Sequence, residues 1–299
     1  MKVAIIHDYL IQYGGAERVL ESLLKIFPSA HVYTLLYSRR QTNGQFVKNV
    51  YKTSFLDFEL VRRYHRPFIP LMPLAIESMK INGDYDLIIS ATAGYAKGIN
   101  FKPAHNPGPY HISYIYTPLR YAWEAENYFT NPIFKTFFRP AFNYLKNWDF
   151  KAAQKPQFIF AVSNFIARKI KNYYGRDSQV LYPPLDRRKF YFDKKAEKQI
   201  KSRDYYLAAG RLLHYKKFDL IIEAFRELNL PLKIAGVGPE YVNLKSQILN
   251  LKNVELLSLV SDQELQKLYQ GAKAFIFPHV EDFGLVAVEA QSCGTPVIA

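Results

Sequence analysis

Short apolar segments alternate with amphipathic segments along the whole chain, and this alternation constrains the fold more than any other feature. Apolar runs typical of buried β-strands predict strands at residues 3–6, 31–36, 85–90, 111–116, 158–162, 180–182, 205–209, 232–235, 254–257, 274–277 and 297–299. Apolar residues at helical spacing predict helices at residues 16–27, 139–153, 165–174, 218–228, 240–251 and 261–269, and a last helix that ends at Gly294. This order predicts an α/β protein whose parallel sheets carry helices on both faces.

The chain divides best after Pro183-Pro184, where the first series of strands and helices ends. A charged stretch at residues 186–204 follows, and a second series begins at residue 205. Because 299 residues suffice for two ordinary domains, we predict two α/β domains at residues 1–184 and 185–299. The chain ends at Ala299 inside a run of strand type, so we expect the second domain to be truncated at its C-terminal end.

Two carboxylates, Glu281 and Glu289, flank the sequence Phe283-Gly284-Leu285 at a spacing of eight residues. In a helix, residues eight apart lie about two turns apart on nearly one face. If Glu281 lies in the loop before the helix and Glu289 within it, both can line one pocket. Free N–H groups at the start of such a helix suit a phosphate or an electron-rich sugar. The alternative is an ordinary loop and amphipathic helix that carry two exposed acids.

Two further loops suit an anionic ligand. Arg211 and Lys216 follow the strand at residues 205–209, at the carboxyl end where α/β sheets bind ligands. Arg can hold phosphate through two hydrogen bonds, and Lys adds a mobile point charge. Gly14-Gly15 joins the first strand to the first helix, where paired glycines permit a tight turn and a helix N-terminus favours a diphosphate. The alternatives are a solvated basic loop and a plain strand-to-helix turn.

Together, these motifs resemble those of the retaining glycosyltransferases of family four, the group 1 transferases, which have the GT-B fold. The resemblance is carried by residues 278–297, 210–216 and 13–17, and residues 114–124, 161–164 and 182–186 add to it. It implies two Rossmann-like domains that face each other across a cleft, with an acceptor-side domain at residues 1–184 and a nucleotide-sugar-binding domain at residues 185–299. It also implies a metal-independent hexosyltransferase that needs no cofactor beyond its nucleotide-sugar substrate.

The resemblance implies a role for each site residue. Glu281 is implied to be the catalytic residue that contacts the donor sugar near the reacting carbon, and it is not assigned as a covalent nucleophile. Glu289 is implied to hold the ribose, and Arg211 and Lys216 are implied to bind the diphosphate. The remaining implied donor contacts are Gly14, Gly15, Phe283, Gly284 and Leu285.

One position departs from the family's pattern. Relatives often carry His before the Thr-Pro pair, where this chain has Tyr116, so a contact that depends on that His is in doubt. Asp8, near the end of the first strand, is a candidate contact for donor or acceptor. We interpret His7, His111 and His279 as packing residues.

The stretches at residues 7–18 and 117–123 look like those of bacterial transferases that build cell-surface polysaccharides. Several of these use GDP-mannose, so we predict retaining transfer of a hexose, with mannose as the leading sugar, to a glycan or lipid-linked acceptor. One alternative is a nucleotide-sugar epimerase or phosphorylase on the GT-B scaffold. Another is a non-catalytic module that binds a nucleotide sugar.

The formal net charge is +14, and most of the basic excess lies in the first 185 residues. Residues 55–74, which include Arg62, Arg63 and Arg66, and residues 135–148 combine basic and aromatic side chains. This composition is typical of proteins that associate with anionic membrane surfaces, so we predict such a contact. The alternative is that the aromatics pack in the core and the charges are solvated. Nucleic-acid binding would rest on charge alone and is not predicted.

Other features bound the location and the cofactors. The single cysteine, Cys293, allows no disulfide within the chain, which fits a reducing compartment. The N-terminus reads as a strand rather than a signal peptide, and no apolar run is long enough to span a membrane. We therefore predict a cytoplasmic protein that can associate with the inner face of the cytoplasmic membrane. Residues 236–239, Gly-Val-Gly-Pro, lack the third glycine of a dinucleotide motif, and no metal site is predicted.

Overall fold

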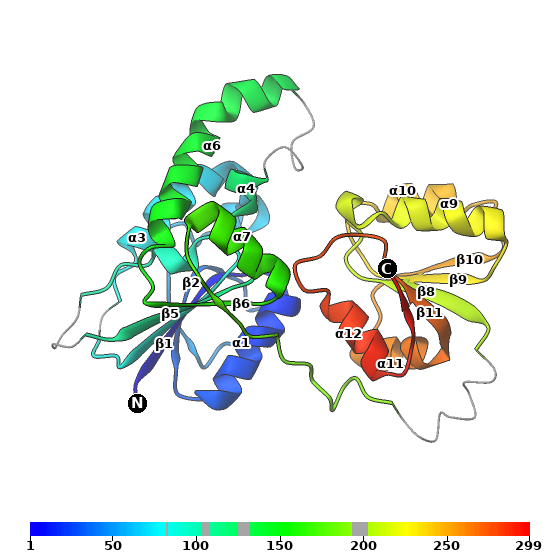
Figure 1. Ribbon diagram of the computed structural model, residues 1–299, viewed down its shortest axis with the longest axis horizontal. Coiled ribbons are helices and arrows are strands. Elements are labelled where there is room, and N and C mark those ends of the chain that lie inside the picture. Colours follow the sequence, from blue (N-terminus) through cyan, green and yellow to red (C-terminus); the bar gives the residue numbers. More distant parts are fainter. Residues whose placement is uncertain (82, 103–107, 125–131, 193–202) are drawn as a thin grey trace. The chain divides into compact units, whose positions relative to one another are not determined.

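The computed structural model describes residues 1–81, 83–102, 108–124, 132–192 and 203–299, and the side chains at residues 132–137 are not described. The chain forms two compact units, Met1–Pro184 (unit 1) and Leu185–Ala299 (unit 2) (Figure 1). Each unit is a sheet with helices on both of its faces, and each is described by itself.

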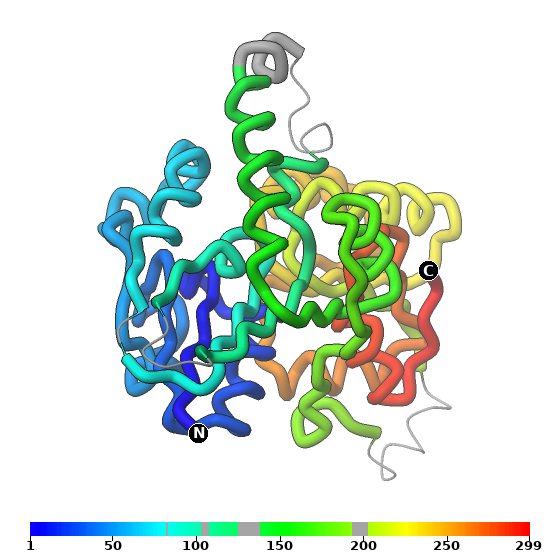
Figure 2. Tube along the Cα trace, turned by 60° about the vertical axis from the view of Figure 1, so that its left-hand side comes forward, coloured from blue at the N-terminus to red at the C-terminus, as the bar shows by residue number. Residues whose placement is uncertain are grey.

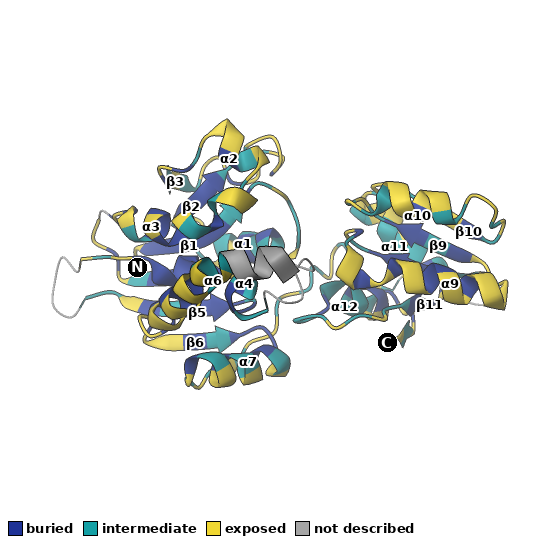
Figure 3. Cartoon of the chain, turned by 90° about the horizontal axis from the view of Figure 1, so that it is seen from above, coloured by how far each residue is buried: buried dark blue, intermediate teal, exposed yellow. Residues whose placement is uncertain are grey.

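The sheet of unit 1 has seven parallel strands in the order β3-β2-β1-β4-β5-β6-β7. Their bounds are β1 Val3–Leu10, β2 His31–Tyr37, β3 Val50–Thr53, β4 Leu87–Thr92, β5 Tyr110–Ile115, β6 Phe158–Ala161 and β7 Gln179–Val180. The central strands are rich in apolar residues because both of their faces are covered. Figure 3 shows these strands as mostly buried.

Helix α1, Gly15–Ile26, packs on one face of this sheet through Leu20, which lies in a core cluster with Val3 and Ile5 of β1. The other face is covered by short helices and by the long α6. These are α2 Glu59–Arg63, η1 Arg66–Leu71, α3 Met72–Ser78, η2 Ala96–Gly98, α4 Arg120–Trp123 and α6 Pro132–Ala152, and α7 Asn164–Tyr174 follows β6. Figure 2 shows the described part of α6 rising away from the rest of unit 1, and Leu145, Trp148 and Ala152 near its C-terminal end lie in the core cluster on this face of the sheet.

A fully buried ion pair joins several of these helices. Lys97 Nζ lies 2.5 Å from Asp149 Oδ1, and both side chains are 0% exposed. The other carboxylate oxygen of Asp149 accepts hydrogen bonds from Trp123 Nε1 at 2.8 Å and from the Tyr174 hydroxyl at 2.6 Å. Asp149 therefore ties η2, α4 and α7 to α6.

The sheet of unit 2 has five parallel strands in the order β10-β9-β8-β11-β12. The strands are β8 Tyr205–Ala209, β9 Leu232–Ala235, β10 Val254–Leu257, β11 Ala272–Ile276 and β12 Val297–Ile298. Helices α9 Phe218–Leu228 and α10 Tyr241–Gln247 pack on one face, and α11 Asp262–Gly271 and α12 Leu285–Ser292 on the other (Figure 1). The short helix η4, His214–Lys216, lies between β8 and α9.

The predicted α/β class with parallel sheets is confirmed. In unit 2, β8, α9, β9 and β10 have the predicted bounds. Several other bounds were wrong: β1 continues to Leu10, α6 begins at Pro132 rather than at residue 139, and the helix predicted at residues 240–251 ends at Gln247. The elements β3, α2, η1 and α3 were missed. Strand β3 is a half-exposed edge strand, and prolines stand in the first turns of η1 and α3, where they read as breaks although a first turn tolerates them.

Candidate functional site

Three polar side chains meet at the carboxyl ends of β8 and β11, which are neighbours in the sheet of unit 2. Lys216 in η4 places its Nζ 2.7 Å from Glu281 Oε1, and His279 Nε2 lies 3.1 Å from the same oxygen. The side chains are 10% exposed for Lys216, 18% for Glu281 and 6% for His279. The carboxyl edge of a parallel sheet is where α/β proteins bind ligands, so this cluster is the candidate site.

Glycines shape the loop that carries Lys216. Gly210 leaves β8 with a φ of +145°, and a Cβ on it would lie 3.5 Å from Lys216 Nζ. Gly236 follows β9 with a φ of +154°, and its backbone lies so close to Gly210 that a Cβ on it would be 1.9 Å from the Gly210 carbonyl oxygen. The Leu212 amide then donates to the Val237 carbonyl at 2.9 Å. The glycines of residues 236–239 therefore allow the loop after β9 to pack closely against the loop after β8, which is the loop that carries Lys216.

The carboxyl group of Glu281 is held in its ionised form. Burial alone would raise its pKa, but the hydrogen bond from His279 and the charge of Lys216 outweigh burial and lower the pKa to about 2. A carboxylate can only accept hydrogen bonds, so His279 Nε2 must carry the proton that it donates. Glu281 is therefore anionic at neutral pH and cannot act there as a proton donor.

The predicted residues Phe283, Gly284 and Leu285 lie at the N-terminus of α12. Gly284 caps the helix with a φ of +80°, and a Cβ there would lie 3.1 Å from the ring of Phe277. The structure thus places Glu281 in the loop before the helix. Glu289 lies inside the helix, 2% exposed, with the Tyr269 hydroxyl 3.5 Å from its Oε2. The two carboxylates differ in burial, and the alternative of two exposed acids is wrong.

The predicted diphosphate contacts differ in exposure. Arg211 is exposed at the start of the loop after β8, whereas Lys216 is nearly buried. The structure brings Lys216 directly to Glu281. The hydrogen bond from His279 to Glu281 was not predicted, because we interpreted His279 as a packing residue. The available signal was its position, two residues before Glu281.

In unit 1, Gly14 and Gly15 form the predicted turn at the start of α1. The Gly14 amide donates to Glu17 Oε2 at 2.8 Å, so part of this helix N-terminus is already satisfied by the chain itself. The Tyr116 hydroxyl donates to the Ala16 carbonyl at 3.3 Å, and burial raises its pKa. Tyr116, where relatives often carry His, thus binds the first turn of α1. The role of Gly14 and Gly15 in donor binding stays a prediction.

Asp8 has a structural role in unit 1. Its carboxylate is 5% exposed and accepts hydrogen bonds from the Thr92 hydroxyl and from the backbone amides of residues 93, 95 and 96, at 2.5 to 3.1 Å. Both oxygens are engaged in shaping the loop after β4. The hypothesis that Asp8 contacts a ligand therefore gains nothing from the structure.

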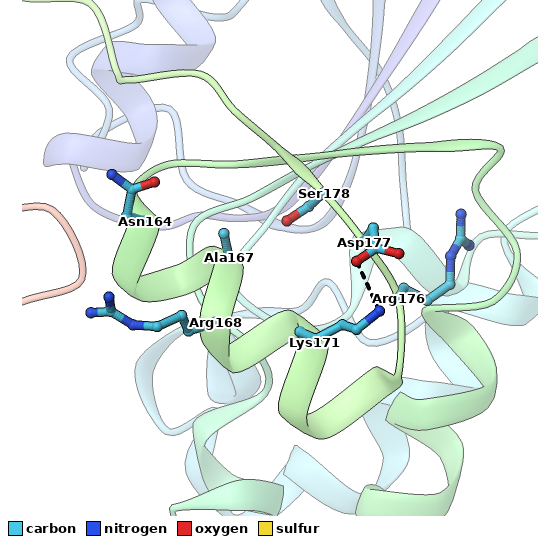
Figure 4. Close-up of a pocket in the computed structure, with 7 residues that line it drawn as sticks. All are labelled: Asn164, Ala167, Arg168, Lys171, Arg176, Asp177 and Ser178. Carbon is cyan, nitrogen blue, oxygen red and sulfur yellow. Dashed lines mark hydrogen bonds and ion pairs between the residues drawn. The ribbon is translucent and has the colours of Figure 1, made fainter.

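A concave site lies beside α7, apart from this cluster in the sequence, and has a volume of about 380 Å³. Figure 4 shows its lining residues, Asn164, Ala167, Arg168, Lys171, Arg176, Asp177 and Ser178. Lys171 pairs with Asp177 at 2.8 Å, and the Arg176 guanidinium donates to main-chain carbonyls after α6. Two of its three cations are thus engaged in holding the chain, and none of the predicted site residues lines it.

The described residues contain neither a candidate metal cluster nor a helix that could cross a membrane. No group of three or more His, Cys, Asp or Glu side chains there is placed to hold a metal ion. Within the same residues, no helix has both the length and the apolar character needed to cross a membrane.

The candidate site lies in a segment of the chain that matches a known protein family. Residues 190–299 match the family described as Glycosyl transferases group 1. D-rhamnosyltransferase WbpZ of Pseudomonas aeruginosa is 32% identical over 100 residues, which are 32% of this chain and 26% of that protein. Mannosylfructose-phosphate synthase of Agrobacterium fabrum is 32% identical over 109 residues, which are 31% of this chain and 24% of that protein. The matches thus span about a quarter of these relatives.

Among solved structures, the Anabaena protein Alr3699/HepE in complex with UDP matches the whole chain. Its TM-score is 0.68 at 18% identity, and the match covers 100% of this chain and 80% of that one. A likeness at this identity shows the fold, so the predicted GT-B fold is confirmed.

Proposed function

We propose that the chain is a retaining glycosyltransferase that moves a hexose from a nucleotide sugar to a glycan or lipid-linked acceptor. One observation carries the proposal: Lys216 and Glu281 form a partly buried pair at the carboxyl edge of β8 and β11, inside the segment that matches the group 1 family. A cation and an anion thus lie side by side, which fits a nucleotide sugar because its diphosphate is bonded directly to a sugar.

The charges of the site fit the charges of the reaction. Breaking the bond between the sugar and the diphosphate leaves negative charge on phosphate, which Lys216 and Arg211 would stabilise. Positive charge develops at the sugar carbon, and an ionised Glu281 would stabilise it. Because its pKa is about 2, Glu281 acts in this scheme through its charge and not by giving up a proton. Glu289, buried in α12, would bind the ribose, and the amides at the start of α12 would face the diphosphate or sugar.

GDP-mannose is the proposed donor, in cell-surface polysaccharide synthesis. The name of the Agrobacterium relative includes a mannosyl group, whereas the Anabaena protein was solved with UDP and with UDP-glucose. The second observation favours testing a uridine donor alongside the guanosine one.

Transfer can be tested with radiolabelled GDP-mannose and UDP-glucose incubated with the protein and a bacterial membrane-lipid extract. Labelled glycolipid from GDP-mannose, lost in Glu281→Gln and Arg211→Ala, is the expected result. Label from UDP-glucose alone would keep the transferase and reject the mannosyl donor. No transfer from either donor, by folded protein that binds both, would reject the transferase.

The acceptor side is proposed to meet an anionic membrane surface. Residues 55–74, which include α2, η1 and the start of α3, expose Phe55, Phe58, Leu60, Tyr64, Leu71 and Leu74. Arg63 and Arg66 are exposed among them, whereas Arg62 is held by Asp57 at 2.7 Å. In the second basic and aromatic stretch, residues 135–137 lie outside the described side chains, and Leu145 and Trp148 are buried. Core packing therefore accounts for part of that second stretch.

Sedimentation with anionic liposomes at low salt tests this surface. The double variant Arg63→Ala/Arg66→Ala is expected to lose binding, while Arg226→Ala, on the exposed side of α9, is expected to retain it. Equal loss in both variants would show a general charge effect, and no binding by the unmodified chain would reject the membrane contact.

A further inference from the structure

In the candidate site of unit 2, the lysine already pairs with an anion of the chain itself. Lys216 is 10% exposed, and its Nζ lies 2.7 Å from Glu281 Oε1. A diphosphate that binds Lys216 must therefore share the ammonium group with Glu281 or replace the carboxylate. The carboxylate thus occupies a place that the proposed function assigns to phosphate.

His279 binds the same oxygen from another direction. Its Nε2 lies 3.1 Å from Glu281 Oε1, and its ring packs on Phe277 with ring centroids 4.3 Å apart. The imidazole is 6% exposed, so it is fixed at the end of β11. This hydrogen bond needs no charge on the imidazole and does not depend on Lys216. Glu281 would keep one partner if Lys216 turned to a phosphate.

We propose that Glu281 competes with the donor diphosphate for Lys216, and that His279 is the positioning residue that retains Glu281 in the site when Lys216 transfers to phosphate. This inference rests on the proposed function. It assigns Glu281 two opposite effects: its charge weakens the binding of a bare diphosphate, and it favours the transition state, in which the sugar becomes positive. A residue that interacts more favourably with the transition state than with the ground state accelerates the reaction.

Calorimetric titration with GDP, UDP and ADP tests the competition without any acceptor. Glu281→Gln is expected to bind the preferred nucleoside diphosphate about three- to tenfold more tightly than the unmodified chain, because the competing charge is gone. The matched control is Glu255→Gln, since Glu255 pairs with Lys233 at 3.4 Å on the same unit, away from the site. The control is expected to leave the affinity unchanged. Unchanged or weaker binding by Glu281→Gln would overturn the competition.

A double-mutant cycle tests the role of His279. In the unmodified background, His279→Ala is expected to weaken nucleotide binding about two- to fivefold, because phosphate must then take Lys216 from a carboxylate that has no other partner. In the Glu281→Gln background the same substitution is expected to have no effect. His279→Gln, which retains a donor, is expected to recover part of the loss.

The other possible results would each contradict one part of the proposal. Equal effects of His279→Ala in both backgrounds would mean that His279 acts on the loop and not through Glu281. If the unmodified chain binds a nucleoside diphosphate but Glu281→Gln does not bind it more tightly, the proposed function stands and the competition is wrong. If the folded, unmodified chain binds none of the three, the proposed function fails and the inference fails with it.

Discussion

Replacing Lys97 by Met should destabilise unit 1 strongly, because it leaves the carboxylate of Asp149 buried without its cation. Lys97 and Asp149 are 0% exposed, and the donors that remain, Trp123 and Tyr174, are neutral. Breaking a buried ion pair by removing one partner costs about 3–5 kcal/mol. The expected loss is therefore about 4 kcal/mol.

Urea denaturation followed by tryptophan fluorescence measures this loss, because both tryptophans of the chain, Trp123 and Trp148, lie in unit 1. Lys151→Met, which removes an exposed lysine from the same end of α6, is the control and should change the free energy of unfolding by less than about 0.5 kcal/mol. The double variant Lys97→Met/Asp149→Asn should recover part of the loss, because the buried charge is gone. A loss below about 1 kcal/mol in Lys97→Met, or no recovery in the double variant, would refute this reasoning.

Three further predictions concern other parts of the fold. Gly236→Ala should destabilise unit 2 by more than about 3 kcal/mol by calorimetry, since its Cβ would lie 1.9 Å from a carbonyl oxygen. Gly175→Ala, which has open space around it, should lower the free energy of unfolding of unit 1 by only about 1–2 kcal/mol. Equal costs for the two variants would contradict the steric argument. Tyr116→Phe should lower the free energy of unfolding of unit 1 by about 1 kcal/mol, because the hydrogen bond to the first turn of α1 is lost; no change in the urea midpoint would show that this bond is not stabilising. Burial and the charge of Lys155 lower the pKa of His111 to about 4. The imidazole is therefore protonated at a higher pH in the unfolded chain than in the folded one, and unit 1 should lose stability as the pH falls from about 6.5 towards 4. An NMR titration of the His111 imidazole with a midpoint near 6.5 would contradict this.

Much of the fold could be predicted because buried parallel strands are continuous apolar runs. Strands β8, β9 and β10 are short, apolar and bounded by polar turns, and their predicted bounds match the structure. The region of α2, η1 and α3 could not be predicted in this way. It contains three prolines, two in the first turns of η1 and α3 and Pro70 inside η1, and its exposed apolar residues obscure the helical period.

The candidate site was predictable in its parts and not in its contacts. The position of Glu281 before the helix and of Glu289 inside it follows from Gly284, which starts α12 with a positive φ. The pairing of Lys216 with Glu281 joins residues 65 positions apart and depends on β8 and β11 being neighbours in the sheet, which local patterns do not specify. The hydrogen bond from His279 depends on the path of one loop, so residue spacing alone could not distinguish it from packing.

The binding of nucleoside diphosphates to unit 2 tests the central claim most directly. Calorimetric titration of the whole chain with GDP, UDP and ADP should show saturable binding of at least one of them. Lys216→Met should abolish that binding and Arg211→Ala should weaken it, while Lys233→Met, which removes a partly exposed lysine from an ion pair with Glu255, should leave it unchanged. Binding that is equal in the unmodified chain and in folded Lys216→Met would contradict the assignment of the donor site to the carboxyl edge of β8 and β11.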